Sequence, residues 1–342
     1  MKKILIINVN WLGDIIFSTP VFKALKRQYP QAAITCLGVP RVREVLECAP
    51  GVDHVLVYDE KGRDWNLFAK LGLILKLRKE KFDAVFLLHR SMTRALLVYL
   101  AGIPQRIGYD IKAKGPLLTH RVPATDNLIH RSDHYLKVIE SFGVKVDDRV
   151  CELKADQEAE EYIARLFQEK GIGPADFTVV VNTGGNWGLK RWPQENFVRL
   201  IGRLAQDLQA KIILPGGKQD IEMVEDIAGK SGVPIINAAG QTNLKQLAAL
   251  MKKVCLVISA DSGPLHVADS VGANTVALFG PTRPEMTGPR GKGKNILLQN
   301  DVGCNREPCY HLECPDNVCM KSINVEQVLD AVRQFKIKTA TR

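Results

Sequence analysis

The sequence predicts an α/β protein with two doubly wound parallel sheets, and three observations support this fold class. Short apolar runs alternate with amphipathic segments along the chain, as expected when helices connect parallel strands. The chain has 342 residues, whereas single hydrophobic cores stop growing near ~250–300 residues. A polar, acidic segment at 152–161 interrupts the alternation near the middle. We therefore expect two domains, at 1–155 and 156–342.

The apolar runs are the expected strands, and the amphipathic segments between them are the expected helices. The strands are expected at 3–9, 33–37, 54–57, 84–88, 178–182, 211–214, 233–236, 254–258 and 275–279. The helices are expected at 15–28, 66–79, 156–170, 194–208, 219–229 and 243–252. A last helix is predicted after Asn324, a good N-cap residue, with one apolar stripe formed by Val325, Val328, Leu329 and Val332.

The composition excludes several classes of protein. Apolar residues make up 46% and charged residues 25%, which is typical of a globular chain. No apolar run approaches the ~18 residues of a membrane-spanning helix, and the N-terminal apolar patch has the pattern of a strand, not of a secretion signal. Aromatic residues are only 6%, with no basic run interleaved among them, so we do not expect a nucleic acid partner. We expect a cytoplasmic protein.

The excess positive charge lies almost entirely in the first half of the chain. Residues 1–150 hold 24 Lys and Arg against 15 Asp and Glu, a balance of +9, and the rest holds 23 against 22. A basic half attracts an anionic partner such as an acidic membrane surface or a phosphorylated substrate, although it can also serve solubility alone.

Ligands of doubly wound sheets bind beyond the carboxyl ends of the strands, so the turns at these ends carry the candidate chemistry. After the run at 3–9, Asp14 lies in the first turn of the expected helix, where the helix dipole stabilises a carboxylate. This carboxylate can accept a proton from a substrate hydroxyl, or it can serve only the helix end.

The turn after 178–182 combines glycines with two cations. Gly184 and Gly185 let the backbone approach a ligand, and Lys190 and Arg191 stand just before a helix. Cations at this end of a helix oppose its dipole by roughly 0.3–1 kcal/mol each. A bound phosphate would resolve this conflict, and so would a nearby surface carboxylate.

Two further turns favour a nucleoside diphosphate held by the second domain. Glu222 lies in a first helical turn, from which a carboxylate can accept hydrogen bonds from ribose, or it is an ordinary surface residue. At 261–266 a helix begins directly after an apolar strand, with Asp261 or Ser262 as N-cap and Pro264 near its first position. The backbone N–H groups at such a helix start bind anions, although an ordinary capped helix has the same pattern.

Four motifs resemble the bacterial heptosyltransferases of glycosyltransferase family 9. They are WLGDIIFSTP at 11–20, RIGY at 106–109, KRWPQENF at 190–197 and ADSGPLHVADSVGANTVALFGPT at 260–282. The resemblance implies the GT-B architecture, in which two Rossmann-like domains face each other across a cleft. It also implies inverting transfer of heptose from ADP-heptose to the inner core of lipopolysaccharide. The Trp-x-Gly-Asp motif and the tail cysteines are most similar to the heptosyltransferases II, which extend an acceptor that already bears one heptose.

The resemblance also implies roles for individual residues. By motif position, Asp14 matches the catalytic base and Lys190 a residue that contacts donor phosphate and sugar. Glu222 matches a ribose contact and Asp261 a contact with the donor sugar, while Ser262 and Gly263 offer N–H groups to the diphosphate. His266 has either a ligand contact or a buried hydrogen bond. At Gly184, Gly185 and Asn186 the resemblance implies donor contacts through the backbone. No metal site is expected, because no aspartate pair with metal spacing accompanies these turns; Mg²⁺ is compatible with the diphosphate but not required.

The expected partners are a nucleotide-sugar donor and an anionic glycolipid acceptor at the inner leaflet of the inner membrane, bound by a monomer in peripheral contact with that membrane. Candidates for steering the acceptor are Lys61, Arg63 and Arg90, together with Arg94, Lys112 and Lys114. Three alternatives stay open here: a family 9 transferase with another sugar or acceptor, a GT-B nucleotide-sugar epimerase, and a noncatalytic binder.

The eight cysteines form two groups. Three of the scattered residues Cys36, Cys48, Cys151 and Cys255 lie in or near apolar runs, where thiols act as small hydrophobes. The tail residues Cys304, Cys309, Cys314 and Cys319 recur every five positions. Their spacers are at the long end of zinc-site spacing, so we rank reduced thiols first, a metal second and disulfides third.

Overall fold

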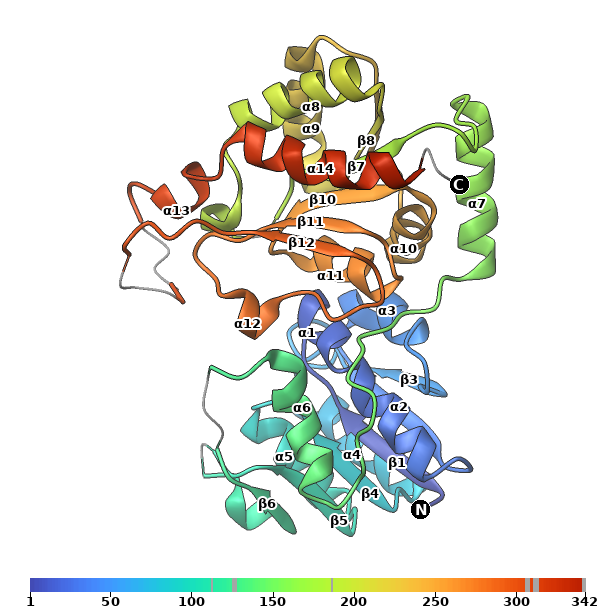
Figure 1. The fold of residues 1–342 in the computed structure, drawn as a ribbon. Helices are drawn as coiled ribbons and strands as arrows, with labels where there is room; N and C mark the ends of the chain where they lie inside the picture. Colours follow the sequence, from blue (N-terminus) through green and yellow to red (C-terminus); the bar gives the residue numbers. More distant parts are fainter. Residues whose placement is uncertain (112, 125–127, 186, 305–307, 310–313, 340–342) are drawn as a thin grey trace. The chain divides into compact units, whose positions relative to one another are not determined.

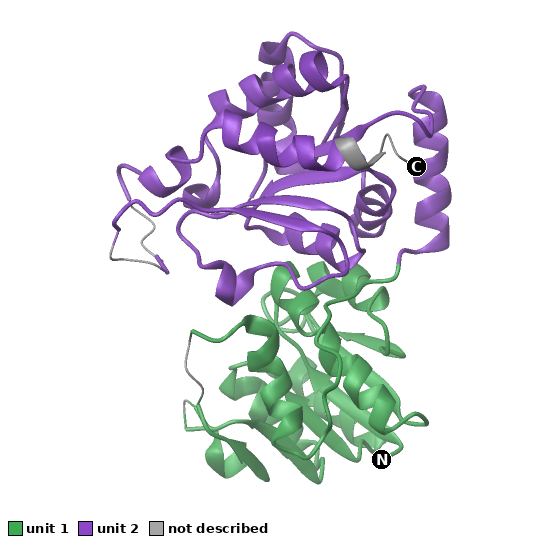
Figure 2. Ribbon diagram, viewed as in Figure 1, with its two compact units in different colours: residues 1–154 green, residues 155–342 purple. Residues whose placement is uncertain are grey.

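The structure is a computed structural model that describes residues 1–111, 113–124, 128–185, 187–304, 308–309 and 314–339 (Figure 1). It divides into two compact units, Met1–Lys154 and Ala155–Arg342, called unit 1 and unit 2 (Figure 2). Each unit is a parallel sheet with helices on both faces, so we describe each by itself.

The sheet of unit 1 has six parallel strands in the order β3-β2-β1-β4-β5-β6. The strands are β1 (Lys3–Ile7), β2 (Ala33–Gly38), β3 (His54–Val57), β4 (Ala84–Leu87), β5 (Gln105–Tyr109) and β6 (His120–Val122). The central strand β1 pairs Ile4 with Ile34 of β2 and with Ala84 of β4, and Ile4–Ile7 are buried. The chain order reverses between β1 and β4, which makes this the topological switch point of unit 1.

Helices cover both faces of this sheet (Figure 1). One face carries α1 (Leu12–Phe17), α2 (Thr19–Gln28), α3 (Arg43–Glu47) and α6 (Arg131–Glu140), and the other carries α4 (Leu67–Glu80) and α5 (Met92–Leu100). The single helix expected at 15–28 is two helices. Pro20 has no N–H for the helical ladder, and the hydroxyls of Ser18 and Thr19 instead donate to the carbonyls of Ile15 and Ile16, each at 2.7 Å.

A buried aromatic stack joins α6 to β5. The His134 ring lies on Tyr109 with 4.3 Å between ring centroids and 14° between ring planes. The Tyr109 hydroxyl donates to the backbone carbonyl of His134 at 2.6 Å. Burial, reinforced by the positive charge of Arg90, lowers the pKa of His134 from 6.5 to about 4.

This stack predicts an acid-sensitive unit 1. Between pH 6.5 and about 4 the unfolded chain binds a proton at His134 that the folded chain excludes, so the free energy of unfolding falls with falling pH, by at most about 3 kcal/mol. The variant His134→Phe keeps a flat ring but cannot bind the proton. Urea unfolding at pH 7.5 and 5.0 should show that the free energy of unfolding falls less on acidification in this variant than in the wild type. An equal loss in both proteins would contradict the assignment.

Unit 2 repeats the architecture with the strand order β12-β11-β10-β7-β8-β9. The strands are β7 (Thr178–Asn182), β8 (Lys211–Gly216), β9 (Ile235–Ala239), β10 (Leu256–Ala260), β11 (Thr275–Leu278) and β12 (Asn295–Leu298). The helices α8 (Gln194–Leu208), α9 (Ile221–Ser231) and α14 (Val325–Thr339) share one core with the sheet. On the other face lie α10 (Leu244–Lys253), with α7 (Gln157–Glu169) packed on it, and α11 (Gly263–Ser270). The switch point lies between β7 and β10.

The predicted last helix is confirmed as α14. Its N-cap Asn324 accepts a hydrogen bond from the Gln327 N–H at 2.9 Å, and the Gln327 side chain accepts one from the Asn324 N–H at 2.9 Å. The four predicted apolar positions are buried, with Val325 at 7% exposed and Val328, Leu329 and Val332 at 0%. A reciprocal cap and a buried stripe therefore fix this helix on the sheet of unit 2.

Candidate active site

The two switch points are the places where a ligand can enter between diverging helices at the carboxyl ends of the strands. In unit 2 the turns after β7 and β10 flank this position, and in unit 1 the turns after β1 and β4 do so. The sequence placed Lys190 and Asp261 in the first pair of turns and Asp14 in the second. All three therefore lie where the fold predicts chemistry.

Asn182 ties together the two turns of unit 2. It stands opposite Ser259 in the pairing of β7 with β10. Its amide donates to the Ser259 hydroxyl at 3.0 Å, to the Ser262 hydroxyl at 3.3 Å and to the Gly184 carbonyl at 3.3 Å. Because Asn182 is itself buried, these bonds hold both turns in a fixed relation.

Asp261 is the centre of a buried polar network at the end of β10. Its side chain is 2% exposed, and its Oδ2 accepts hydrogen bonds from Lys190 Nζ at 2.6 Å, Thr282 at 2.6 Å and Thr287 at 3.2 Å. On the other oxygen, Oδ1 lies 3.2 Å from His266 Nε2. Four side chains from separate segments thus converge on one carboxylate.

The charge state of Asp261 follows from these contacts. Burial on its own would raise the pKa of Asp261, but the hydrogen bond from His266 and the positive charge of Lys190 outweigh it, so the pKa lies well below its usual range. The carboxylate is therefore ionised at neutral pH and pairs with the Lys190 ammonium. The sequence places Lys190 just before a helix, where its positive charge opposes the helix dipole. In the structure the buried carboxylate of Asp261 compensates this charge.

The start of α11 lies beside this network. Ser262 is its N-cap residue through the backbone, and Gly263 is its first residue. The Ser262 hydroxyl makes no cap bond but lies 3.2 Å from the Ser259 hydroxyl. The predicted anion-binding N–H groups are thus those of a regular helix start. His266, 4% exposed, makes the buried hydrogen bond that was one of its two expected roles.

The glycines after β7 serve different purposes. A Cβ on Gly184 would lie 3.1 Å from Cγ of Asp220, so this glycine makes room for the neighbouring turn. At Gly185 a Cβ would meet only Ser262 among the residues described, at 3.9 Å, so this position leaves room for a ligand. Arg191 folds back and donates from Nε to the Gly185 carbonyl at 2.8 Å.

Two predicted donor positions stand apart from this network. Glu222 is exposed in the first turn of α9, and its contact with a ribose stays a prediction. Asn186 lies outside the described residues.

In unit 1, Asp14 lies in the first turn of α1, directly after β1, and is half-buried. The Tyr135 hydroxyl, from α6, donates to Asp14 Oδ1 at 2.8 Å. Burial of the ring, together with the charge of Asp14, raises the pKa of Tyr135 well above 10.0. Tyr135 therefore stays protonated and remains a donor, which orients the carboxylate.

Arg94 braces the turn that leads to Asp14. It is 1% exposed and donates to the Asn8 carbonyl at 2.8 Å and to Asn10 Oδ1 at 2.9 Å, while its Nη2 lies 3.1 Å from Glu60 Oε1. The expectation that Arg94 steers a ligand is therefore wrong, because its charge is held inside the unit. Lys114 is 0% exposed, and the same correction applies to it.

The remaining candidates for acceptor steering keep their surface positions. Lys61, Arg63 and Arg90 are exposed, and Arg63 Nε lies 3.5 Å from its neighbour Asp64. Lys112 lies outside the described residues. An acceptor-binding role of the three exposed cations stays a prediction.

The cysteines of the N-terminal unit are interior residues. No disulfide joins any of the eight cysteines in the part of the chain described, and Cys36, Cys48 and Cys151 are buried. Burial raises the pKa of Cys36 to about 12, so this thiol is inert. In the tail, Cys309 is buried and Cys304 is exposed. Among the described residues, which omit 305–307 and 310–313, no three potential metal ligands come together.

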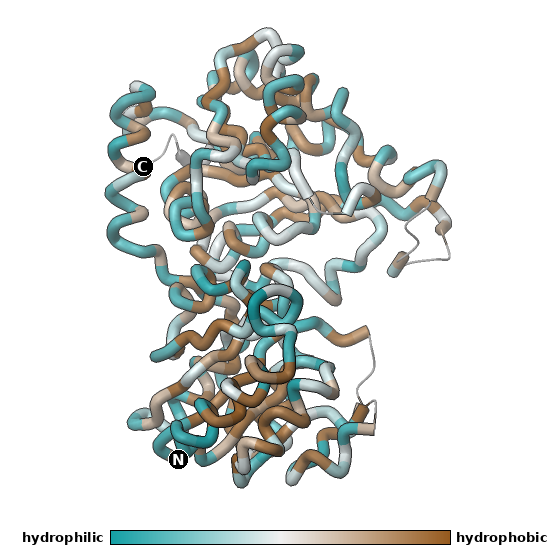
Figure 3. The backbone as a smooth tube through the Cα atoms, turned by 180° about the vertical axis from the view of Figure 1, so that it is seen from behind, coloured by the Kyte–Doolittle hydropathy of each residue, from teal (hydrophilic) through white to brown (hydrophobic). Residues whose placement is uncertain are grey.

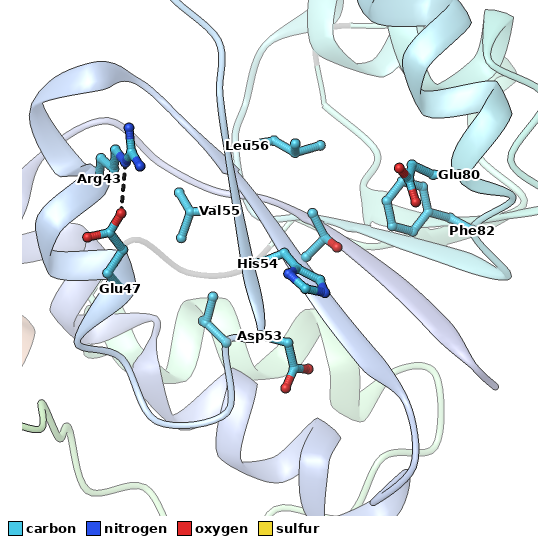
Figure 4. Close-up of a pocket in the computed structure, with 10 residues that line it drawn as sticks. Arg43, Glu47, Asp53, His54, Val55, Leu56, Glu80 and Phe82 are labelled. Atoms are coloured by element: carbon cyan, nitrogen blue, oxygen red, sulfur yellow. Dashed lines mark hydrogen bonds and ion pairs between the residues drawn. The ribbon is translucent and has the colours of Figure 1, made fainter.

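A separate pocket of about 530 Å³ lies beside the edge strand β3 (Figure 4). Arg43 and Glu47 lie on one side of it, paired at 2.7 Å, and Glu80 and Phe82 lie on the other. Asp53 and His54, at the amino end of β3, form part of its wall. This end of the sheet is opposite the switch point, so the pocket is not where the fold predicts a substrate.

Several side chains of the candidate site have no signal in the sequence. Tyr135 is far from Asp14 along the chain, and only the packing of α6 brings them together. Thr287 likewise reaches Asp261 from the short helix α12 (Pro284–Thr287). The polar residues that end β7 and follow β11, Asn182 and Thr282, could have been found from the rule that such strand ends face ligands.

Comparison with known proteins identifies related chains. The sequence model of glycosyltransferase family 9 (heptosyltransferase) matches residues 71–317, which is most of the chain. Lipopolysaccharide heptosyltransferase 2 of Salmonella typhimurium is 26% identical over 311 residues, which cover 86% of this chain and 87% of the relative.

Solved structures agree with the predicted fold. A glycosyltransferase family 9 protein from Veillonella parvula superposes with a TM-score of 0.86 at 27% identity, covering 98% of this chain and 97% of the other. The ADP-heptose lipopolysaccharide heptosyltransferase II of Escherichia coli gives a TM-score of 0.81 at 22% identity, covering 99% of both chains. The two doubly wound parallel sheets of the GT-B type are thereby confirmed.

Proposed function

Because the chain belongs to glycosyltransferase family 9, we propose that it moves a heptose from ADP-heptose to the inner core of lipopolysaccharide, with inversion at the anomeric carbon. The names of its relatives support this donor and this acceptor class. Family membership makes the chain a glycosyltransferase and therefore favours transfer over the epimerase and noncatalytic alternatives. We further propose an acceptor that already bears one heptose, as for the relatives called heptosyltransferase 2.

The observation that carries the proposal is the ion pair of Lys190 with buried Asp261 at the switch point of unit 2. In this proposal unit 2 binds the donor, and unit 1 binds the acceptor. The leaving ADP gains negative charge on its diphosphate as the sugar departs. Fixed positive groups that meet this charge are a strong source of transition-state stabilisation. Lys190 and the N–H groups at the start of α11 supply them.

Lys190 can turn to a diphosphate without leaving Asp261 unsatisfied. Thr282 and Thr287 continue to donate to Oδ2, and His266 continues to meet Oδ1. The Lys190 side chain is 21% exposed, whereas Asp261 is 2% exposed, so the lysine reaches solvent and the carboxylate stays buried. Asp261 thus acts chiefly as the residue that positions Lys190, and its direct contact with the donor sugar remains a proposal.

In unit 1, Asp14 is the proposed general base. The acceptor hydroxyl gives its proton to the Asp14 carboxylate as its oxygen forms a bond to the anomeric carbon. The bond from that carbon to the diphosphate oxygen breaks, and ADP leaves with the electron pair. Tyr135 already occupies Oδ1 of Asp14, so Oδ2 is the oxygen that takes the proton.

Tyr135 is a positioning residue for this base. The variant Tyr135→Phe should lower kcat about tenfold, because the carboxylate loses a charge-assisted hydrogen bond that orients it. The KM for ADP-heptose should not change. Tyr58→Phe is the matched control, since Tyr58 is also buried in unit 1 and its hydroxyl has no partner among the residues described. Equal kinetics of the two variants would contradict the role of Tyr135.

The proposed acceptor is an anionic glycolipid, so we propose that the enzyme works in peripheral contact with the inner leaflet of the inner membrane, from the cytoplasmic side. We propose separately that it is a monomer. The surplus of basic residues before position 150 supports this location.

We also propose that no metal is required, because Lys190 and the start of α11 supply the positive charge at the diphosphate. Activity should therefore survive treatment with EDTA.

The proposal is tested by incubating the protein with ADP-heptose and acceptors that bear zero, one or two heptoses. The products are then weighed by mass spectrometry. We expect one added heptose on the one-heptose acceptor only. Transfer to the bare acceptor would assign an earlier step. Failure with all three acceptors, or transfer from another nucleotide sugar only, would overturn the proposed donor and acceptor.

A further inference from the structure

Helix α4 carries two apolar faces, but only one of them faces the core. Ile74 and Leu77 are buried against the sheet of unit 1. Leu67, Leu71 and Leu75 recur every four residues on another side, where they are 68%, 47% and 63% exposed. Phe68, on this outer side, is 84% exposed. A helix that serves only the fold would carry polar residues at these positions.

The exposed row continues onto α5. Arg78, one turn beyond Leu75, donates from its guanidinium to the carbonyl of Leu100 at 2.8 Å, so this side of α4 borders α5. The outward residues of α5 are also apolar: Met92, Leu96, Tyr99 and Leu100 are 38–46% exposed. The two helices therefore present one joint surface, which we call the α4–α5 face. It comprises Leu67, Phe68, Leu71, Leu75, Met92, Leu96, Tyr99 and Leu100 of the helices and Trp65, which lies two residues before α4.

This face is unusual for the molecule. Of the fourteen large apolar side chains that are exposed among the residues described, nine belong to it. Figure 3 shows the backbone from behind with brown hydrophobic stretches in both units, and the exposed fractions identify which of the apolar residues lie at the surface. Contiguous exposed apolar surface of this kind marks a place where a protein meets a partner or a membrane.

The charges around the α4–α5 face indicate that its partner is anionic. Residues 61–81 contain seven Lys and Arg against two acids, a balance of +5. One of these acids, Glu80, lies 3.0 Å from Lys3, so its charge is partly compensated. Lys76, Arg78 and Lys79 are exposed within the same helix as the apolar row. Exposed Trp, Phe and Leu side chains with flanking cations are the pattern of a helix that lies in the interface of an anionic bilayer.

We propose that the α4–α5 face docks unit 1 onto the surface of an anionic phospholipid bilayer, with its apolar side chains inserted among the headgroups and its cations against lipid phosphates. This inference rests on the proposed function, which places the acceptor in a membrane, and it names the surface that meets that membrane. No helix in the part of the chain described is long and apolar enough to cross a bilayer. Side chains that reach only among the headgroups give a peripheral attachment.

The test measures binding of the full chain to vesicles. Vesicles of phosphatidylethanolamine with phosphatidylglycerol provide an anionic surface, and vesicles of phosphatidylcholine provide a neutral one. We expect the wild type to sediment with the anionic vesicles and not with the neutral ones. The triple variant Phe68→Gln/Leu71→Gln/Leu75→Gln keeps good helix formers on the surface and should lose on the order of tenfold or more in binding. The variant Lys76→Gln/Lys79→Gln should weaken binding and reduce its dependence on salt.

The control is Leu297→Gln/Val318→Gln, which removes two exposed apolar side chains of unit 2 and should bind like the wild type. Equal vesicle binding by the wild type and the triple variant would overturn the proposal. The proposal would also be overturned if the wild type did not bind vesicles but formed a dimer that the triple variant does not form. The face would then be a contact between two copies of the chain.

A soluble acceptor separates this inference from the proposed function. With a delipidated one-heptose core fragment, the triple variant should transfer heptose as fast as the wild type, because no bilayer is involved. If the wild type binds anionic vesicles but transfers no heptose to any acceptor, the docking surface stands and the proposed function fails. If the wild type transfers heptose but does not bind vesicles, the proposed function stands and the docking surface fails.

Discussion

Replacing Asp14 by asparagine is expected to lower the turnover number for heptose transfer by about a thousandfold. Asparagine has the same shape and can still accept the hydrogen bond from Tyr135, so the fold of the turn should persist. It cannot accept the proton of the acceptor hydroxyl, which must then be lost without a base. ADP should bind with unchanged affinity, because the groups proposed to hold the diphosphate belong to unit 2.

The measurements are steady-state kinetics with both substrates and calorimetric titration with ADP. Glu44→Gln is a matched control, since Glu44 also lies in the first turn of a helix in unit 1, α3. Its kcat should stay within about twofold of the wild type, because the proposed reaction transfers no proton to Glu44. If Asp14→Asn retained more than a tenth of the wild-type turnover, Asp14 would not be the base.

The regular parts of the fold were predictable because they follow a simple period. All nine expected strands are present, and the runs at 54–57 and 178–182 match β3 and β7 residue for residue. These strands lie in parallel sheets and are mostly continuous apolar runs, which are easy to recognise. The helices after them show the helical period with one buried face.

Three strands were not predicted, and each departs from this pattern. β5 and β6 begin with exposed polar residues, and β6 has only three residues at the sheet edge. β12 is also an edge strand, and its residues are exposed or half-buried. An edge strand has one neighbour and needs less apolar surface, so its sequence carries a weaker signal.

The candidate site was predictable in its positions and not in its contacts. Asp14, Lys190 and Asp261 could be placed at strand ends from the order of elements alone. That Lys190 pairs with Asp261 could not, because the two lie on separate turns and their contact depends on the pairing of β7 with β10. The interior position of Arg94 was missed because a lone arginine is usually at the surface.

Removing the charge of Lys190, which pairs with Asp261, is expected to lower both stability and turnover. Lys190→Met keeps the length of the side chain and removes its charge. The buried Asp261 carboxylate then loses a charged partner but keeps two threonines and a histidine, so the free energy of unfolding should fall by about 2 kcal/mol. The turnover number should fall by about a hundredfold to a thousandfold, because the leaving diphosphate loses a fixed positive charge.

The double variant Lys190→Met/Asp261→Asn separates these two effects. A neutral asparagine needs no cation, so urea unfolding should show stability closer to the wild type than to Lys190→Met. Transfer should stay as slow as in Lys190→Met, because no charge faces the diphosphate. Recovery of both stability and turnover would contradict the catalytic role, since Lys190 would then serve only to neutralise Asp261. Loss of stability with normal turnover in the single variant would contradict it equally, because the ammonium would be needed by the fold and not by the reaction.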